Sequence, residues 1–135
     1  ENSAADAFDA EFSVVNLENV KIQKTKGECI GVKRGKYFIS NAYLESCGDK
    51  AVSAGELSNI NAKNLDIRKS YVGLFAKNNS KIVAENFVGQ ENYYCLWSGQ
   101  SYLGFNGSLI SVKNDKIDCD KGKLREDNYS KITIN

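Results

Sequence analysis

A small set of aromatic and basic side chains in the middle of the chain has the chemistry needed to bind a sugar. The faces of aromatic rings carry partial negative charge and can stack on the C–H faces of sugar rings, and ammonium groups bind carboxylates. The candidates are Phe75, Tyr94, Trp97, Lys33 and Lys77. We expect them to contact an extended polysaccharide.

A second interpretation buries the same rings. The segment 99–107 contains Tyr102, Leu103 and Phe105, which need an apolar surface to lie on. Contiguous bare aromatic patches are uncommon on soluble proteins. The aromatic candidates can therefore be the floor beneath this segment instead of a ligand surface.

Carboxylates near the start of the chain are the other group with possible chemistry. Asp9, Glu11 and Glu28 can serve as cation ligands or as general acids and bases, although a solvated surface is the simpler interpretation. The segment 118–122 is similar to a calcium loop but lacks the third ligand before its glycine, so we predict a polar turn. We expect no catalytic residue, no metal ion and no cofactor.

The composition excludes several classes of function. The chain has no histidine, which removes the Ser-His-Asp triad, the Cys-His dyad and imidazole metal sites. With 18 Lys+Arg against 17 Asp+Glu, the net charge of +1 gives no reason to expect nucleic acid as a partner. No apolar run approaches the roughly 20 residues that span a bilayer.

A repeat of 22 residues predicts the secondary structure on which these side chains lie. Within each repeat, apolar and polar residues alternate, which is the pattern of half-buried strands, about three to a repeat. Two apolar columns and one asparagine column recur at this spacing. They are Phe8, Ile30, Val52, Leu74, Leu96; Ala10, Val32, Ala54, Ala76, Ser98; and Asn19, Asn41, Asn64, Asn86.

This periodicity predicts a parallel β-helix. One repeat cannot bury its own apolar side, whereas stacked repeats bury a continuous core. Asparagine suits the bends, since it tolerates left-handed backbone and its amide can bond to the same group one turn away. A β-sandwich is the alternative, but it does not require a fixed 22-residue period.

We predict a single all-β domain over residues 1–135, with about five to six turns. The regular turns cover 5–117, and an irregular last turn or cap covers 118–135. The fifth turn is longer by about six residues. The excess falls in 99–107, which we interpret as a loop inserted at one corner.

The four cysteines allow three full pairings and match no zinc pattern. Cys29 and Cys95 share one column, three turns and roughly 14 Å apart, which exceeds the reach of a disulfide. Cys47 falls at a corner and Cys119 in the cap. We therefore expect mostly free thiols, buried or at corners.

Three pieces of the sequence match a known family. They are Asp6-Ala7-Phe8-Asp9, Gly48-Asp49-Lys50-Ala51-Val52-Ser53 with Gly55-Glu56, and Val72-Gly73-Leu74 with Lys77 and Ser80. In these pieces the chain resembles the right-handed parallel β-helix proteins of the pectate-lyase-like superfamily, and more narrowly repeat segments of bacterial extracellular β-helix proteins of unassigned role. The resemblance covers about residues 5–92. It implies a right-handed coil and favours an extracellular or cell-surface location. Lyases, hydrolases, epimerases and adhesins share this fold, so the resemblance does not fix an activity.

We therefore expect a non-catalytic β-helix module, carbohydrate-binding or structural, within a larger bacterial surface or secreted protein. The absence of an initiator methionine before Glu1 favours a processed protein or a piece of a longer one. A polysaccharide lyase or epimerase acting on an acidic glycan is one alternative. It would need Asp9 or Glu11 to converge with Lys33 or Lys77, although Asp9 and Lys77 lie three turns apart, roughly 14 Å. An assembly protein that stacks end to end through unpaired strands is the other.

Overall fold

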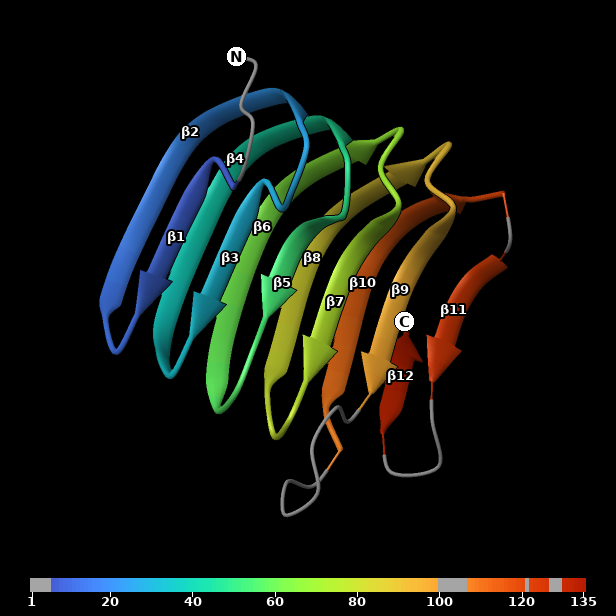
Figure 1. Cartoon of the computed structure of the whole chain (residues 1–135). Helices are drawn as coiled ribbons and strands as arrows, with labels where there is room; N and C mark the ends of the chain where they lie inside the picture. The colour runs from blue at the N-terminus through green and yellow to red at the C-terminus, as the bar shows by residue number, and fades with distance from the viewer. Residues whose placement is uncertain (1–5, 100–106, 121, 127–129) are drawn as a thin grey trace.

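The computed structural model describes residues 6–99, 107–120, 122–126 and 130–135, and its elements are strands in two sheets. The chain alternates between a sheet of short strands and a sheet of longer ones (Figure 1). The short strands are β1 (Phe8–Glu11), β3 (Ile30–Lys33), β5 (Lys50–Ala54), β7 (Val72–Lys77), β9 (Tyr94–Gly99) and β11 (Gly122–Glu126). The others are β2 (Val14–Thr25), β4 (Gly35–Cys47), β6 (Ser58–Arg68), β8 (Lys81–Gln90), β10 (Leu109–Asp118) and β12 (Lys131–Ile134). The described residues contain no helix of the length and apolar character needed to cross a membrane.

All strand pairs are parallel, and together they form the predicted right-handed β-helix (Figure 1). The 22-residue repeat is the stacking register, since Phe8 pairs with Ile30, Ile30 with Val52 and Val52 with Leu74. The register lengthens where β4 pairs with β6, since Lys36 faces Asn59. It lengthens further at the fifth turn, which confirms that this turn contains an insertion.

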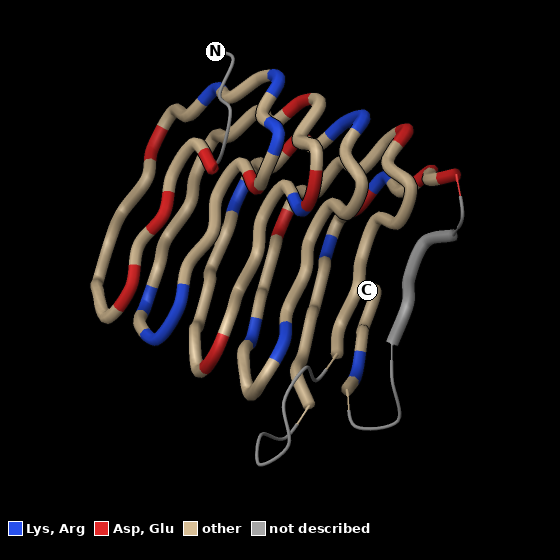
Figure 2. The backbone as a smooth tube through the Cα atoms, viewed as in Figure 1, with Lys and Arg blue, Asp and Glu red and all other residues tan. Residues whose placement is uncertain are grey.

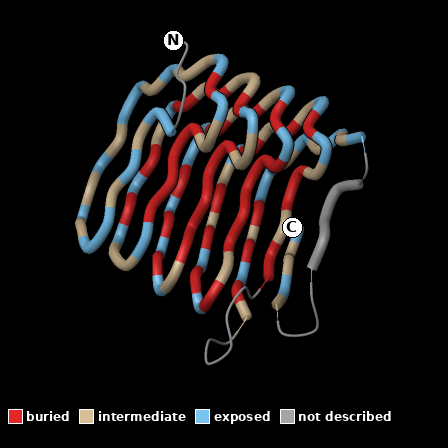
Figure 3. Tube along the Cα trace, in the orientation of Figure 1, coloured by how far each residue is buried: buried red, intermediate tan, exposed pale blue. Residues whose placement is uncertain are grey.

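The two apolar columns form the short-strand side of the core and pack against inward residues of the long strands, such as Ile39 and Leu44 (Figure 3). Ile30, Val52, Leu74 and Leu96 are fully buried, and each such side chain stabilises the fold by about 1.5–3 kcal/mol. Phe8, in the first turn, belongs to the same column but is only partly buried. The column therefore gains full burial only where turns pack on both of its sides.

The asparagine column bends each long strand. Asn19, Asn41, Asn64 and Asn86 have φ values of 55°, 55°, 57° and 56°, which is left-handed backbone that asparagine tolerates. The amide nitrogens of Asn41, Asn64 and Asn86 each donate to the amide oxygen of the asparagine one turn earlier, at 3.2, 2.8 and 2.9 Å. The alternation predicted two short strands on either side of each asparagine, but the structure has one strand with a bend there. The predicted ladder of asparagine amides is confirmed.

A column of serines lies at the corner where β6, β8, β10 and β12 begin. The backbone N–H of Ser58 donates to Ser80 Oγ at 3.2 Å, that of Ser80 to Ser108 Oγ at 3.2 Å, and that of Ser108 to Ser130 Oγ at 3.0 Å. Buried N–H groups are costly without partners. The serine ladder supplies those partners at a point where the sheet pairing stops.

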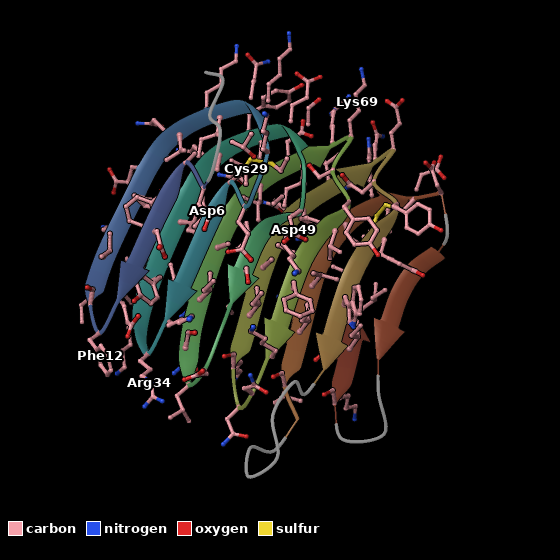
Figure 4. All side chains as sticks on the ribbon, viewed as in Figure 1. Asp6, Phe12, Cys29, Arg34, Asp49 and Lys69 are labelled. Carbon is pink, nitrogen blue, oxygen red and sulfur yellow. A yellow bond between two sulfur atoms is a disulfide. The ribbon has the colours of Figure 1, made fainter. Side chains whose placement is uncertain are left out.

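The prediction of free thiols is wrong, because the structure contains two disulfides. Cys29 bonds to Cys47 and Cys95 bonds to Cys119, with Cα–Cα distances of 5.6 and 5.8 Å (Figure 4). Cys29 and Cys95 do not bond each other, as predicted. Each bond instead joins the start of a turn to the end of the same turn, where the coil returns to its own corner. Sequence reasoning compared cysteines between turns and missed this contact within a turn.

The described residues of the last turn add one strand to each sheet. Leu124 aligns with Leu96 as expected, and Ile132 aligns with Ile110. Lys131 and Thr133 align with the outward positions Leu109 and Ser111 and not with the core columns. Both sheets therefore continue through a sixth strand. Most of the segment 99–107, including Tyr102, Leu103 and Phe105, lies outside the described residues.

Candidate functional site

The predicted site residues lie on the outer face of the short-strand sheet. Phe75 follows Ser53 in one outward column and pairs with Trp97 in the next turn. Lys33 and Lys77 belong to the neighbouring outward column, on β3 and β7. Charged residues lie on β1, β3, β5 and the end of β7, whereas β9 has none (Figure 2). The face therefore has a polar part and an aromatic part.

The polar part is a cleft of about 270 Å³. Both predicted lysines line it, although they lie on strands two turns apart. Gly31, Ser53 and Gly55 form its floor, and the remaining charged residues of its wall are Asp6, Asp9, Glu11 and Glu28. Carboxylates and ammonium groups thus meet in one hollow, a surface suited to sugar hydroxyls and to the charges of acidic sugars.

Two glycines create the depth of this cleft. A Cβ atom on Gly31 would collide with the carboxylate of Glu28, and one on Gly55 would lie 2.9 Å from Lys33 Cγ. The side chains of Glu28 and Lys33 therefore lie flat over glycine backbone. A larger residue at either position would push a charged side chain out of the cleft.

Glu28 is the carboxylate with an altered acidity. Burial raises its pKa above the ordinary value of 4.5, a hydrogen bond with Ser53 opposes that shift, and the negative charge of Asp6 adds to it. Asp6 also accepts a hydrogen bond from the backbone N–H of Glu28, at 2.8 Å. Glu28 thus stays protonated at a higher pH than an exposed carboxylate would.

The aromatic part is a continuous row of ring contacts. Tyr71 stacks on Tyr93 with centroids 5.5 Å apart, and Tyr93 meets Tyr94 edge to face at 4.9 Å. Tyr94 meets Trp97 at 5.6 Å, and Trp97 meets Phe75 at 5.4 Å. Tyr71 and Tyr93 are 42% and 37% exposed, so the row opens to solvent at the corner.

Phe75 differs from the expectation of an exposed ring. It is only 8% exposed, and Lys50 Nζ lies 4.8 Å from its ring centroid, an arrangement that favours the cation. Phe75 is therefore a packing partner for Trp97. The partly exposed predicted rings are those of Tyr94 and Trp97.

Sequence reasoning missed Tyr71, the most exposed ring of the row. The signal was present, because Tyr71 precedes Tyr93 by one 22-residue step. The alternative prediction, that the row lies beneath the segment 99–107, concerns residues that mostly lie outside the described ranges.

Within the described ranges, no group of three or more Cys, Asp or Glu side chains is placed to hold a metal ion. The predicted polar turn at 118–122 lies partly outside those ranges, and its Cys119 is disulfide-bonded. The site is thus one of ring faces, ammonium groups and carboxylates.

Comparison of the chain with models of protein families, with curated proteins and with solved structures gives no match. The parallel β-helix is therefore established by the structure itself.

Proposed function

We propose that the protein is a non-catalytic carbohydrate-binding module that holds an extended polysaccharide on the outer face of the short-strand sheet. The observation that carries this proposal is the row from Tyr71 to Trp97, which is open to solvent at one end and adjoins a polar cleft. Tyrosine and tryptophan give large, rigid contact areas with a polar tip, which suits ligands that have both C–H faces and hydroxyls.

The aromatic part and the polar part of the face contact different groups of the ligand. The face of the Tyr71 ring that is turned away from Tyr93 stacks on one sugar, and Tyr93, Tyr94 and Trp97 lead from there toward the sheet. The cleft, with Lys33 and Lys77 in its wall, takes polar groups further along the chain of sugars. An extended ligand running across successive turns contacts both parts, whereas a monosaccharide contacts one.

The disulfides support a location outside the cytoplasm. Disulfides form and persist in oxidising compartments and are rare in the cytosol. Both bonds join buried or partly buried cysteines within a turn. We propose a part of a larger bacterial surface or secreted protein, related to pectate-lyase-like β-helices, with the sequence resemblance as the remaining support.

Binding to an array of plant and bacterial glycans tests the proposal. Tyr71→Ala removes an exposed ring from the row, and Tyr43→Ala removes a partly exposed ring from β4 as a matched control. We expect Tyr71→Ala to weaken binding at least about fivefold, as for a truncated anchor residue, and the control to bind like the wild type. Equal loss in both variants, or no binding to any glycan, would refute a site at the row.

A polysaccharide lyase or epimerase is the second candidate, favoured by the carboxylates and lysines that line a single cleft. Catalysis would require an acid or base within hydrogen-bond reach of the reacting sugar carbon. Incubation with polyuronate separates the two functions. Unsaturated products would favour the lyase, and binding without product would favour the module.

Self-association through the ends of the coil is the remaining partner proposal. What supports it is the first turn, where Phe8, Val15, Leu17 and Val20 face the core but stay partly exposed. An apolar surface of this kind favours contact with another strand layer. Light scattering over a range of concentrations tests it, and a constant monomer mass would remove it.

A further inference from the structure

The outer face of the long-strand sheet carries a second groove. Two adjoining hollows, of about 240 and 390 Å³, share Phe38, Asn61 and Val83. These residues are consecutive in one outward column across β4, β6 and β8. Phe38 is 42% exposed, so a ring face is open to solvent within the groove. We call this feature the Phe38 groove.

The edges of the Phe38 groove are basic. Lys36 and Lys81 lie along one edge and Lys63 along the other, with Glu85 as the only acidic residue among those that line it. All three lysines are exposed, and none forms an ion pair with a described residue. By contrast, Arg34 and Arg68 are paired with Glu56 and Asp66. Among the described lining residues, three lysines thus face one carboxylate, that of Glu85 beside Lys63, and the groove keeps a net positive charge.

Two asparagine side chains inside the groove are available for hydrogen bonds to a ligand. Asn59 and Asn61 are exposed, and neither side chain has a hydrogen-bond partner among the described residues. The ladder asparagines on the same sheet, such as Asn41 and Asn64, bond to each other. The groove therefore offers amide donors and acceptors that the fold does not use.

We propose that the Phe38 groove binds an acidic saccharide, carboxylated or sulfated, at a site separate from the aromatic row. The ring of Phe38 stacks on a sugar face, Asn59 and Asn61 bond to hydroxyls, and the lysines pair with the acidic groups. Lys36 and Lys81 lie two turns apart, roughly 10 Å. Contact with both requires successive charged groups along a chain and not one compact anion.

Other occupants fit this surface less well. A second copy bound through a two-fold axis would place lysines of one groove against those of the other, which is repulsive. A peptide cannot add as a strand, because β4, β6 and β8 are each paired on both sides. Charge complementarity thus selects an anionic ligand bound through side chains. This inference does not depend on the proposed function, since the two sites lie on different sheets.

Calorimetric titration of the whole chain at low salt tests the inference. The probes are a sulfated heparin hexasaccharide, a galacturonate hexamer and the neutral hexamer of cellulose. Phe38→Ala tests the ring, and Lys36→Gln with Lys81→Gln tests the charge. The matched controls are Phe12→Ala, an exposed ring in the first turn, and Lys24→Gln with Lys26→Gln, exposed lysines without ion pairs to described residues.

We expect at least one acidic hexamer to bind more tightly than the neutral one, and added salt to weaken it. Phe38→Ala should weaken that binding at least about fivefold, and the lysine pair roughly three- to tenfold, with both controls unchanged. Equal binding of acidic and neutral hexamers, or unchanged binding by the groove variants, would overturn the inference. So would anionic vesicles that compete for the same residues, or an oligomer in light scattering that Phe38→Ala dissociates.

Loss of binding through Tyr71→Ala, with Phe38→Ala unaffected, would place the acidic ligand on the short-strand face and reject the groove. If instead Tyr71→Ala leaves all binding unchanged while Phe38→Ala reduces it, the groove stands and the proposed aromatic site fails. The two proposals therefore fail by different results.

Discussion

Single residues on the short-strand face determine the shape and the charge of the cleft together. Gly31 leaves room for the carboxylate of Glu28 to lie over the backbone, and burial there raises the pKa of Glu28. A side chain at that glycine would move the carboxylate outward into solvent. The acidity of Glu28 thus depends on a neighbour that has no side chain, and its titration reports on the cleft.

Glu28 predicts a pH dependence of stability. Its pKa is raised in the folded protein, so the folded state binds a proton more tightly than the unfolded chain does. The contribution of Glu28 to the free energy of unfolding therefore increases as the pH falls from neutral toward 4.5. Glu28→Gln should therefore gain less stability than the wild type when the pH is lowered from 7 to 5, roughly the range in which an exposed carboxyl is still ionised.

Denaturant unfolding at both pH values measures this difference. Glu18→Gln, an exposed carboxylate on β2, is the control and should keep the wild-type pH dependence. If Glu28→Gln and the wild type gain equal stability on acidification, the carboxylate does not lie in the buried position described.

The bend of the long strands leads to a prediction for the asparagine ladder. Asn64 has φ of 57° and bonds to both Asn41 and Asn86. Asn64→Ala should lower the free energy of unfolding by about 1–3 kcal/mol, because alanine strains left-handed backbone and both side-chain bonds are lost. Asn64→Gly should cost less, since glycine accepts this φ. Urea midpoints of the two variants measure the gap.

Asn61→Ala is the matched control on the same strand. Asn61 is exposed and outside the ladder, so its replacement should change stability by no more than about 0.5 kcal/mol. Similar losses from Asn61→Ala and Asn64→Ala would show that the ladder is not what holds the bend.

The disulfides staple the second and fifth turns. They close loops with sequence separations of 18 and 24 residues. By restricting the unfolded chain, a loop of this size raises the free energy of the unfolded state by about 3 kcal/mol. Replacing Cys95 and Cys119 together by alanine should therefore lower the stability by about this amount. Denaturation under non-reducing conditions measures it. Free thiols in the unfolded, unreduced wild type would contradict the pairing.

At the scale of elements, a strict period made the fold predictable. Val52 and Leu74 could be placed in the core because identical steps separate residues that stack. The partner of Cys29 could not be deduced the same way, because Cys47 meets it across a corner and not along a column. The distance between two residues at a corner depends on the backbone path that closes the turn, and the repeat length does not determine that path.

The whole molecule presents two outer faces, and the sequence showed only one of them as a site. Phe38 lies between Tyr37 and Ile39, which both point inward, so alternation already indicated that Phe38 points outward. What the sequence could not show is that Asn61 and Val83 follow it across two turns and leave a hollow. Exposure of an outward ring depends on the residues stacked beside it, and these come from distant positions.

The two faces should act independently. A site on the short-strand sheet and one on the long-strand sheet share no residue, and changes at separated positions usually add. Tyr71→Ala should therefore leave the affinity of the groove for an acidic hexamer unchanged to within about 0.5 kcal/mol, and Phe38→Ala should do the same for the ligand of the aromatic row. Because neither ligand blocks the other, protein saturated with one should still bind the second with its original affinity.

Sequential calorimetric titrations of the two ligands measure this independence, and the double variant Tyr71→Ala with Phe38→Ala completes the cycle. If the double variant loses the same affinity for each ligand as the corresponding single variant does, the β-helix is bivalent. It can then join two polysaccharide chains, one on each sheet. A first ligand that abolishes binding of the second would contradict this independence and would mean that the two ligands share one site.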